Sequence, residues 1–123
     1  MKVLTKNILI VENNELNLKL FNDILQVNLY GTMLSSECDA LDMARKHHPD
    51  LIIMNIQMPS NSSLKITKLI KADNNLRNIP IIAVTALAMK DDEKKIRDSG
   101  CDGYISKPIA IPQFIETVDK FLG

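Results

Sequence analysis

The sequence has no tryptophan, only 4% aromatic residues and no formal net charge. Its 15 lysine and arginine residues balance 15 aspartate and glutamate residues, so the chain has no general attraction for nucleic acids or anionic membranes. With so few aromatic side chains, a platform on which single-stranded bases stack is also hard to build. These features argue against a nucleic-acid-binding protein.

Long hydrophobic runs are missing as well, since none approaches the roughly 20 apolar residues of a membrane helix. The N-terminal stretch MKVLTKNILIVEN has no small-residue cleavage site after its apolar part, unlike a secretory signal peptide. The two cysteines, Cys38 and Cys101, lie far apart and form no metal-binding or redox spacing. We therefore expect reduced thiols in a cytoplasmic protein without membrane insertion.

The composition is instead that of one ordinary globular domain, with 46% hydrophobic and 24% charged residues among 123. We expect a single domain over residues 1–123. Three short runs, at 8–11, 51–54 and 81–84, are continuously apolar and rich in branched residues. Such runs are typical of strands buried on both faces of a parallel sheet. Weaker candidate strands lie at 32–35 and 103–106.

Between these runs the spacing of apolar residues predicts helices at 15–27, 37–47, 64–72, 89–99 and 111–122. In the first helix, Leu16, Leu20 and Ile24 form the predicted buried stripe, with Phe21 and Leu25 beside it. In the third helix, the predicted apolar positions are Ile66, Leu69 and Ile70. Ser36 precedes the second stretch as a candidate N-terminal cap, and Gly100 is a natural stop for the fourth.

The resulting order, strand then helix repeated five times, predicts right-handed crossovers and a doubly wound α/β sheet with helices on both faces. Ligands of such sheets bind at the carboxyl ends of the strands. Polar residues follow the strands there: Glu12 and Asn13, then Asn55, Thr85 and Lys107. Any one of these could simply end a strand or cap a helix, but their joint occurrence predicts a shared site.

Four segments at these positions resemble the receiver domain of bacterial response regulators, the CheY-like family. They are ILIVENNELN (8–17), PDLIIMNIQMP (49–59), IPIIAVTALAM (79–89) and GYISKPI (103–109), so the resemblance covers nearly the whole chain. It implies the flavodoxin-like (βα)5 fold with five parallel strands in the order 2-1-3-4-5. Within the family, the runs at 14–21, 86–109 and 114–122 are most similar to single-domain regulators of bacterial cell division.

In receivers, two acidic residues after the first strand and an aspartate after the third hold Mg²⁺, and that aspartate accepts a phosphoryl group from a histidine kinase. By this resemblance, Glu12 matches the first acid, whereas Asn13 stands in place of the second. Asn55 stands in place of the phosphoacceptor. The candidate metal ligands are therefore Glu12, Asn13, Asn55 and Gln57.

The resemblance also assigns roles to residues near the last two strands. Thr85 and Lys107 match the residues that contact the phosphoryl oxygens, and Tyr104 matches the aromatic switch residue. Ala86 and Met89 lie on the expected switch and interface surface, and Pro108 matches a proline with a cis peptide bond.

The departures from the family pattern concern the chemistry. A carboxylate is a competent nucleophile, whereas the amide of Asn55 is uncharged and its nitrogen lone pair is delocalised. Mg²⁺ prefers carboxylates and water, so we expect no cofactor and weak or absent Mg²⁺ binding. Ser63, Leu29 and Cys38 stand where glycine is common, which affects the expected loop geometry but not the fold.

We therefore expect a non-enzymatic receiver that acts by protein contact with histidine kinases or adaptors, as a monomer or weak dimer. The expected contact face comprises the charged fourth helix, the fifth strand and the fifth helix. No output segment is evident, which also favours output through protein contact.

Two alternatives stay open. One is a conventional phosphoacceptor whose aspartates were replaced by asparagine, naturally or by engineering. The other is a nucleotide-binding protein of the same fold class. It is less favoured because the turn at 11–15 has no glycine to admit a phosphate.

Overall fold

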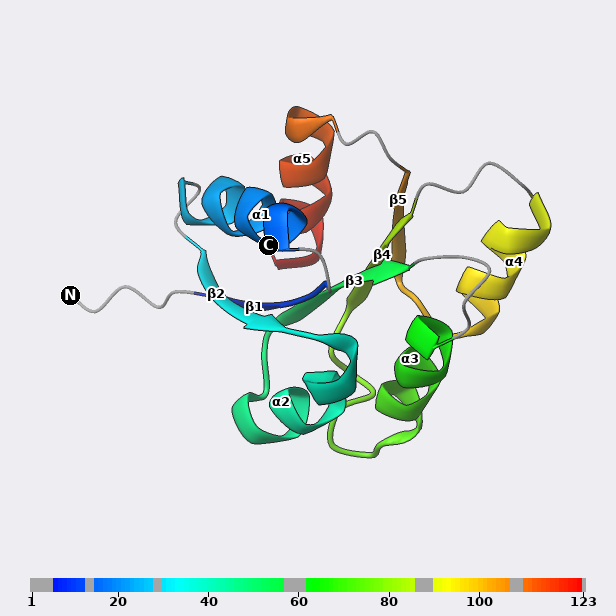
Figure 1. The fold of residues 1–123 in the computed structure, drawn as a ribbon. Helices are drawn as coiled ribbons and strands as arrows, with labels where there is room; N and C mark the ends of the chain where they lie inside the picture. The colour runs from blue at the N-terminus through cyan, green and yellow to red at the C-terminus, as the bar shows by residue number, and fades with distance from the viewer. Residues whose placement is uncertain are drawn as a thin grey trace.

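The computed structural model describes residues 6–12, 15–27, 30–56, 62–85, 90–106 and 110–122. Strands and helices alternate along the chain (Figure 1). The elements are β1 (Asn7–Val11), α1 (Glu15–Val27), β2 (Gly31–Ser35), the short 3₁₀ helix η1 (Glu37–Asp39), α2 (Ala40–His47), β3 (Leu51–Ile56), α3 (Ser62–Ala72), β4 (Ile81–Thr85), α4 (Lys90–Asp98), β5 (Gly103–Ser106) and α5 (Ile111–Leu122). None of the helices in these ranges is long and apolar enough to cross a membrane.

The strands form one parallel sheet in the order β2-β1-β3-β4-β5, which confirms the predicted topology. In the register, Val11 lies opposite Met54, and Ile56 lies opposite Thr85. The carboxyl ends of β1, β3 and β4 therefore meet at one edge of the sheet. The outermost strands are β2 and β5.

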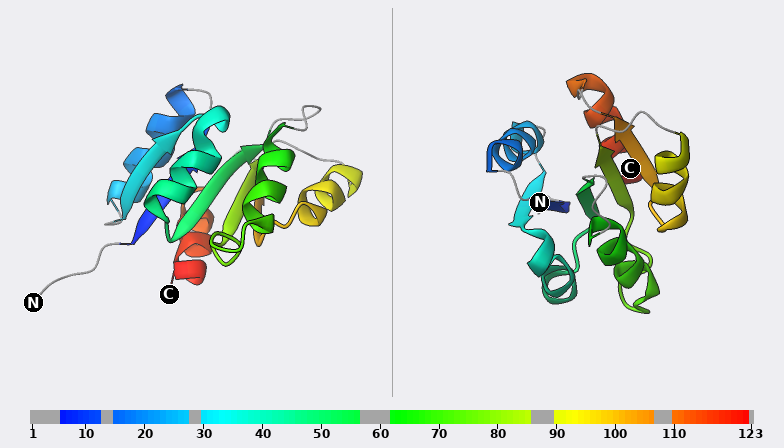
Figure 2. Two further views of the ribbon diagram at one scale, coloured as in Figure 1. Left: turned by 90° about the horizontal axis from the view of Figure 1, so that it is seen from below. Right: turned by 45° about the vertical axis from the view of Figure 1, so that its right-hand side comes forward.

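Helices cover both faces of the sheet (Figure 2), and a hydrophobic core fills each side. On one side, α1 and α5 pack against the strands, and the rings of Phe21 and Phe114 lie 5.5 Å apart between centroids. On the other side, the core includes Ala44 of α2, Ile70 of α3 and Ile96 of α4. All residues of β3 and β4 are buried, which confirms that their continuous apolar runs are interior strands.

The predicted buried stripe of α1 is wrong at two of its three positions. Leu16 and Leu20 are 79% and 47% exposed, whereas Ile24 is buried. Phe21 and Leu25, predicted to lie beside this stripe, are the residues that the helix directs into the core. These two residues are one turn apart, and burying the large ring of Phe21 sets the rotation of the helix.

The prediction for α3 is right for Ile70, which is fully buried, and wrong for its neighbour Leu69, which is 54% exposed. Both residues are apolar, so the periodicity alone did not decide which of them faces the sheet. The helix is turned so that Leu64 and Ile70 reach the core and Leu69 lies at the surface.

The predicted helix ends are partly right. The turn η1 follows Ser36, so α2 begins at Ala40 and its N-cap residue is Asp39 rather than the predicted Ser36. Ser36 Oγ instead donates to Asp39 Oδ2 at 3.4 Å. Gly100 ends the fourth helix as predicted, with a φ of +108° that favours glycine.

Lys71, in the last turn of α3, ties together the segments that precede β4 and β5. Its Nζ donates to the carbonyl oxygens of Arg77 and Ile79 and to Asp102 Oδ2, at 3.2, 2.9 and 2.6 Å. The same oxygen of Asp102 accepts a bond from the backbone N–H of Ile81 at 2.9 Å. One ammonium group thus links α3, the start of β4 and the start of β5.

On the other side of the sheet, Tyr30 links the start of β2 to α5. Its hydroxyl donates a hydrogen bond to Asp119 Oδ1. Burial, the hydrogen bond and the charge of Asp119 together raise the pKa of Tyr30 from 10.0 to about 12. Each of these effects disfavours the phenolate.

Gly103, at the start of β5, lies against the last turn of α5. A Cβ atom at this position would stand 2.9 Å from Cε2 of Phe121, closer than side chains pack. The absence of a side chain therefore allows the ring of Phe121 to lie directly on the backbone of β5.

We predict that Lys71→Met lowers the free energy of unfolding by about 1.5–3 kcal/mol, because it removes a charged donor that serves three acceptors. Urea denaturation measures this change. Lys68→Met, at an exposed position of the same helix, is the matched control and should change the free energy by less than about 0.5 kcal/mol. Equal losses in the two variants would contradict the assigned role of Lys71.

We also predict that stability falls as the pH rises from 10 to about 12, since Tyr30 ionises more readily in the unfolded chain. The stabilising contribution of the protonated Tyr30 is fully present below pH 10. It is lost as the pH rises through the pKa of Tyr30 in the folded protein, about 12. Much of the phenol is solvent-accessible, so the effect stays below about 1 kcal/mol. Tyr104→Phe leaves Tyr30 as the single tyrosine, and its ultraviolet titration should have a midpoint near 12. A midpoint at the ordinary value would contradict the prediction.

Candidate functional site

Glu12 and Asn55 occupy neighbouring positions at the carboxyl edge of the sheet. The register pairs Val11 with Met54, so the next residue of each strand places Glu12 beside Asn55. Adjacent strands lie roughly 4.8 Å apart. Alternation along β1 and β3 directs both side chains toward the face covered by α1 and α5, following Ile10 and Ile53 of the same core.

Thr85 lies at the end of the neighbouring strand β4 and is fully buried. It follows Ala83, which packs in the core beneath α3 and α4, so alternation directs Thr85 toward that opposite face. Tyr104 of β5 is half-buried and packs against the same core. Since Tyr104 pairs with Ala83, it lies diagonally across from Thr85 on one face of the sheet.

The structure thus places Glu12 and Asn55 side by side on one face of the sheet, at the ends of β1 and β3. Thr85 lies at the end of the neighbouring strand β4, directed toward the opposite face. Six other residues predicted for this site or its switch surface lie outside the described residues: Asn13, Gln57, Ala86, Met89, Lys107 and Pro108. Their predicted roles stay predictions.

The polar groups of this cluster are deeply buried. Glu12 is 2% and Asn55 is 5% exposed, and the backbone N–H of Glu12 donates to the carbonyl of Ser35 at 3.0 Å. Within the described ranges, Asn55 Oδ1 has no hydrogen-bond partner. A buried amide oxygen in this position can accept a bond from a ligand or a neighbouring donor.

The described donors fit Mg²⁺ poorly. In the described parts of the chain, no group of three or more His, Cys, Asp or Glu side chains is placed to hold a metal ion. The cluster offers one carboxylate, from Glu12, and one neutral amide oxygen, from Asn55. Mg²⁺ is usually bound through one or two carboxylates together with waters or phosphates. With a single carboxylate, the described donors should therefore bind Mg²⁺ weakly.

A pair of buried hydroxyl groups supports Asn55 from α3. Ser63 Oγ donates to the carbonyl oxygen of Asn55 at 3.2 Å, and Thr67 Oγ1 donates to the carbonyl of Ser63 at 2.9 Å. Both hydroxyl-bearing residues are at most 2% exposed. In the sequence, Ser63 is notable only as a replacement of glycine, which does not predict its bond to the site.

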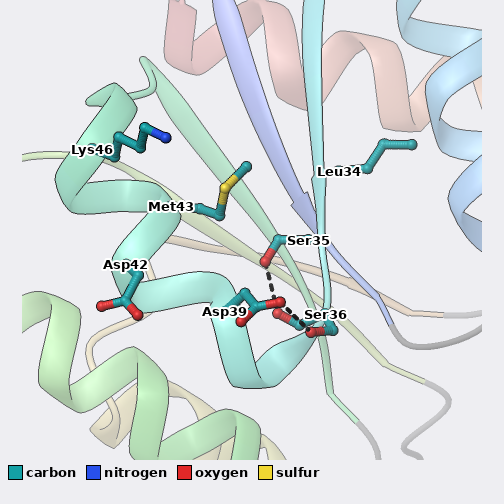
Figure 3. A pocket seen from close by; sticks show the side chains of 7 residues that line it. All are labelled: Leu34, Ser35, Ser36, Asp39, Asp42, Met43 and Lys46. Carbon is teal, nitrogen blue, oxygen red and sulfur yellow. Dashed lines mark hydrogen bonds between the residues drawn. The ribbon is translucent and has the colours of Figure 1, made fainter.

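A pocket of about 430 Å³, which no sequence motif indicated, lies between β2 and α2 (Figure 3). It is lined by Leu34, Ser35, Ser36, Asp39, Asp42, Met43 and Lys46. In Figure 3, Met43 projects from α2, whereas Leu34 lies on the other side of the β2 ribbon. The pocket adjoins the strand-end cluster through Ser35, whose carbonyl binds the N–H of Glu12.

A second pocket, of about 300 Å³, lies between α4 and β5 and includes Tyr104 in its wall. Cys101 also lines it, and burial raises the pKa of this thiol. Cys101 is a free cysteine, as is the exposed Cys38, which agrees with the predicted reduced thiols. Because the protonated thiol is a weak nucleophile, Cys101 acts mainly as an apolar wall of the pocket.

With this geometry in place, comparisons identify the family. Residues 8–119 match the response regulator receiver domain. The chain is 56% identical over 121 residues to the polar-differentiation response regulator DivK of Brucella ovis, covering 98% of both proteins. DivK of Brucella anthropi is 55% identical over 119 residues, covering 96% of this chain and 97% of that protein.

Solved structures of receiver proteins have the same fold as this chain. The receiver domain of a sensor histidine kinase from Pseudomonas aeruginosa, which contains a magnesium ion coordinated in its active-site cleft, superposes with a TM-score of 0.88 at 27% identity. The alignment covers 98% of this chain and 99% of that one. CheY4 of Vibrio cholerae, at 19% identity and a TM-score of 0.87 over 96% and 99% of the two chains, shares the fold. The chain therefore belongs to the response regulator receiver family of two-component signalling proteins.

Proposed function

We propose that this chain is a single-domain response regulator with a degenerate phosphorylation pocket, which acts through contact with histidine kinases or adaptors in cell-division signalling. The observation that carries this proposal is the amide of Asn55, buried at the end of β3 beside the carboxylate of Glu12. The similarity to DivK supports the signalling context. A single domain over residues 1–123, a cytoplasmic location and a monomeric or weakly dimeric state belong to the same proposal.

The amide changes the reaction that the pocket supports. A carboxylate attacks phosphorus through an anionic oxygen, whereas the oxygen of Asn55 is neutral and its nitrogen lone pair is delocalised. In the assigned roles, Thr85 and Lys107 could still contact an anion, but Asn55 would not form an acyl phosphate. The pocket then serves recognition rather than phosphoryl transfer.

The charge balance leads to the same conclusion for Mg²⁺. Three carboxylates and one lysine give −3 + 1 = −2, whereas Glu12 and Lys107 give −1 + 1 = 0, with Asn13 and Asn55 neutral. At about 4 Å and an effective dielectric near 20, each pair of unit charges contributes about 4 kcal/mol. The loss of two carboxylates therefore weakens Mg²⁺ binding strongly and also relieves repulsion in the resting pocket.

Two surfaces support a role in protein contact. The first is the predicted face of α4, β5 and α5, which includes the half-buried Tyr104. The second is the exposed side of α1, where Leu16, Leu20 and Val27 are 79%, 47% and 81% exposed. Their spacing places all three on one stripe of the helix, as expected for a surface that packs against a helix of a partner.

The alternative is a conventional phosphoacceptor in which asparagine replaced aspartate at positions 13 and 55. The observation that favours it is the retained frame, since Glu12, Asn55 and Thr85 lie at the strand ends where a working receiver needs them. This alternative requires that reversion of both positions to aspartate restores Mg²⁺ binding and phosphorylation.

We predict that the unmodified chain gains no phosphoryl group from acetyl phosphate with Mg²⁺, as measured by intact mass. Asn13→Asp together with Asn55→Asp should restore both Mg²⁺ binding and labelling, because the variant regains two carboxylates. Asn75→Asp with Asn78→Asp, at two exposed positions far along the chain from the cluster, makes the same charge change and should restore neither.

One result would exclude the proposal, and another would exclude the alternative. A phosphoryl adduct on the unmodified chain would exclude the degenerate pocket. Failure of the Asn13, Asn55 double variant to bind Mg²⁺ would mean that the pocket differs from a working one at further positions.

We predict that Leu20→Asp weakens binding to a cognate histidine kinase by at least about tenfold, since it places a charge in an apolar contact. Isothermal titration calorimetry measures the dissociation constant. Leu69→Asp is the matched control, because Leu69 is similarly exposed but lies on α3 across the sheet. Equal effects of the two variants would exclude α1 as the specific contact surface.

A further inference from the structure

Ser63 connects α3 to the backbone of the residue at the centre of the site. It is the second residue of α3 and is 2% exposed. Its hydroxyl donates to the carbonyl oxygen of Asn55, eight residues earlier, in a bond that is itself buried. A glycine at this position, or an alanine, could not make this bond.

A second hydroxyl group extends the connection along the helix. Thr67 Oγ1 donates to the carbonyl oxygen of Ser63 at 2.9 Å, and Thr67 is fully buried. A threonine that bonds back to the residue four positions earlier often bends a helix locally. The first turn of α3 is therefore held both to its own next turn and to the end of β3.

The side chain of Asn55 has less support than its backbone. Among the residues that the structure describes, its Oδ1 has no hydrogen-bond partner, although Asn55 is only 5% exposed. The bond from Ser63 to the adjacent carbonyl is thus a direct restraint on where the amide of Asn55 lies relative to Glu12 and Thr85.

We propose that Ser63 is a positioning residue, whose hydroxyl fixes the end of β3 and so holds the Asn55 side chain in one arrangement within the strand-end cluster. The importance of the cluster rests on the proposed function. The positioning of Asn55 by Ser63, however, does not depend on whether the protein is phosphorylated. Because Asn55 has the place of the nucleophile in the family, the same bond also determines where a carboxylate would lie after reversion to aspartate.

Ser99 provides a matched control for an ordinary structural role. It is also buried, at 3% exposure, and its hydroxyl also donates to a backbone carbonyl, that of Ile96. It lies just after α4, and its carbonyl partner belongs to that helix rather than to the site. Ser63→Ala and Ser99→Ala therefore remove the same kind of bond, and only the first removes it from Asn55.

The test records the side-chain amide signals of Asn55 by nuclear magnetic resonance in the labelled full chain, with Asn55→Gln to assign them. Ser63→Ala should shift these signals and raise the exchange rate of the amide hydrogens about fivefold, because losing one hydrogen bond at the backbone carbonyl of Asn55 loosens the end of β3. Ser99→Ala should leave both unchanged at a similar loss of stability. Ser63→Thr keeps the hydroxyl and should retain the original signals.

A second arm measures Mg²⁺ affinity in the variant with aspartate at positions 13 and 55. Adding Ser63→Ala should weaken Mg²⁺ binding about fivefold, whereas adding Ser99→Ala should not. Unchanged Asn55 signals in Ser63→Ala would overturn the inference and leave Ser63 a structural residue. If the unmodified chain were phosphorylated, the proposed function would fail, while the amide signals would still decide the role of Ser63. If the reverted variant bound no Mg²⁺, the pocket would differ from a working one at further positions, and the amide signals alone would decide.

Discussion

The parallel register of β1, β3 and β4 is the constraint on which the site depends. Parallel strands of similar length end at one edge, so Glu12, Asn55 and Thr85 meet although more than 70 residues separate the first from the last. The register is set by burial on both faces, because a slip of one residue would exchange the two cores. The position of the polar cluster is therefore a consequence of the hydrophobic sheet beneath it.

The positions of the site residues therefore do not depend on the chemistry of their side chains. The strand-end positions keep their places whether an amide or a carboxylate occupies them, since the backbone and the two cores determine those places. Replacing a carboxylate by an amide at position 55 changes charge and nucleophilicity but hardly changes shape. A receiver can in this way lose the family reaction while its surfaces remain suited to the same partners.

The sequence predicted the interior better than the surface. The runs that became β3 and β4 are apolar at every position, so their burial on both faces follows directly. For α1 and α3 the choice among neighbouring apolar residues depended on packing across the sheet, which a periodic pattern does not contain. The predicted strand ends pointed to Glu12, Asn55 and Thr85, whereas the bond from Ser63 requires knowledge of how α3 returns to β3.

The contact between Gly103 and Phe121 has a mechanical consequence. Because the aromatic ring lies directly on the strand backbone, no flexible side chain separates β5 from the end of α5 to absorb a relative displacement. Any larger residue at position 103 would have to move this ring, and with it the last turn of α5, away from the strand. The space beside β5 is therefore already filled by the helix, on a strand that also carries Tyr104 diagonally across from Thr85.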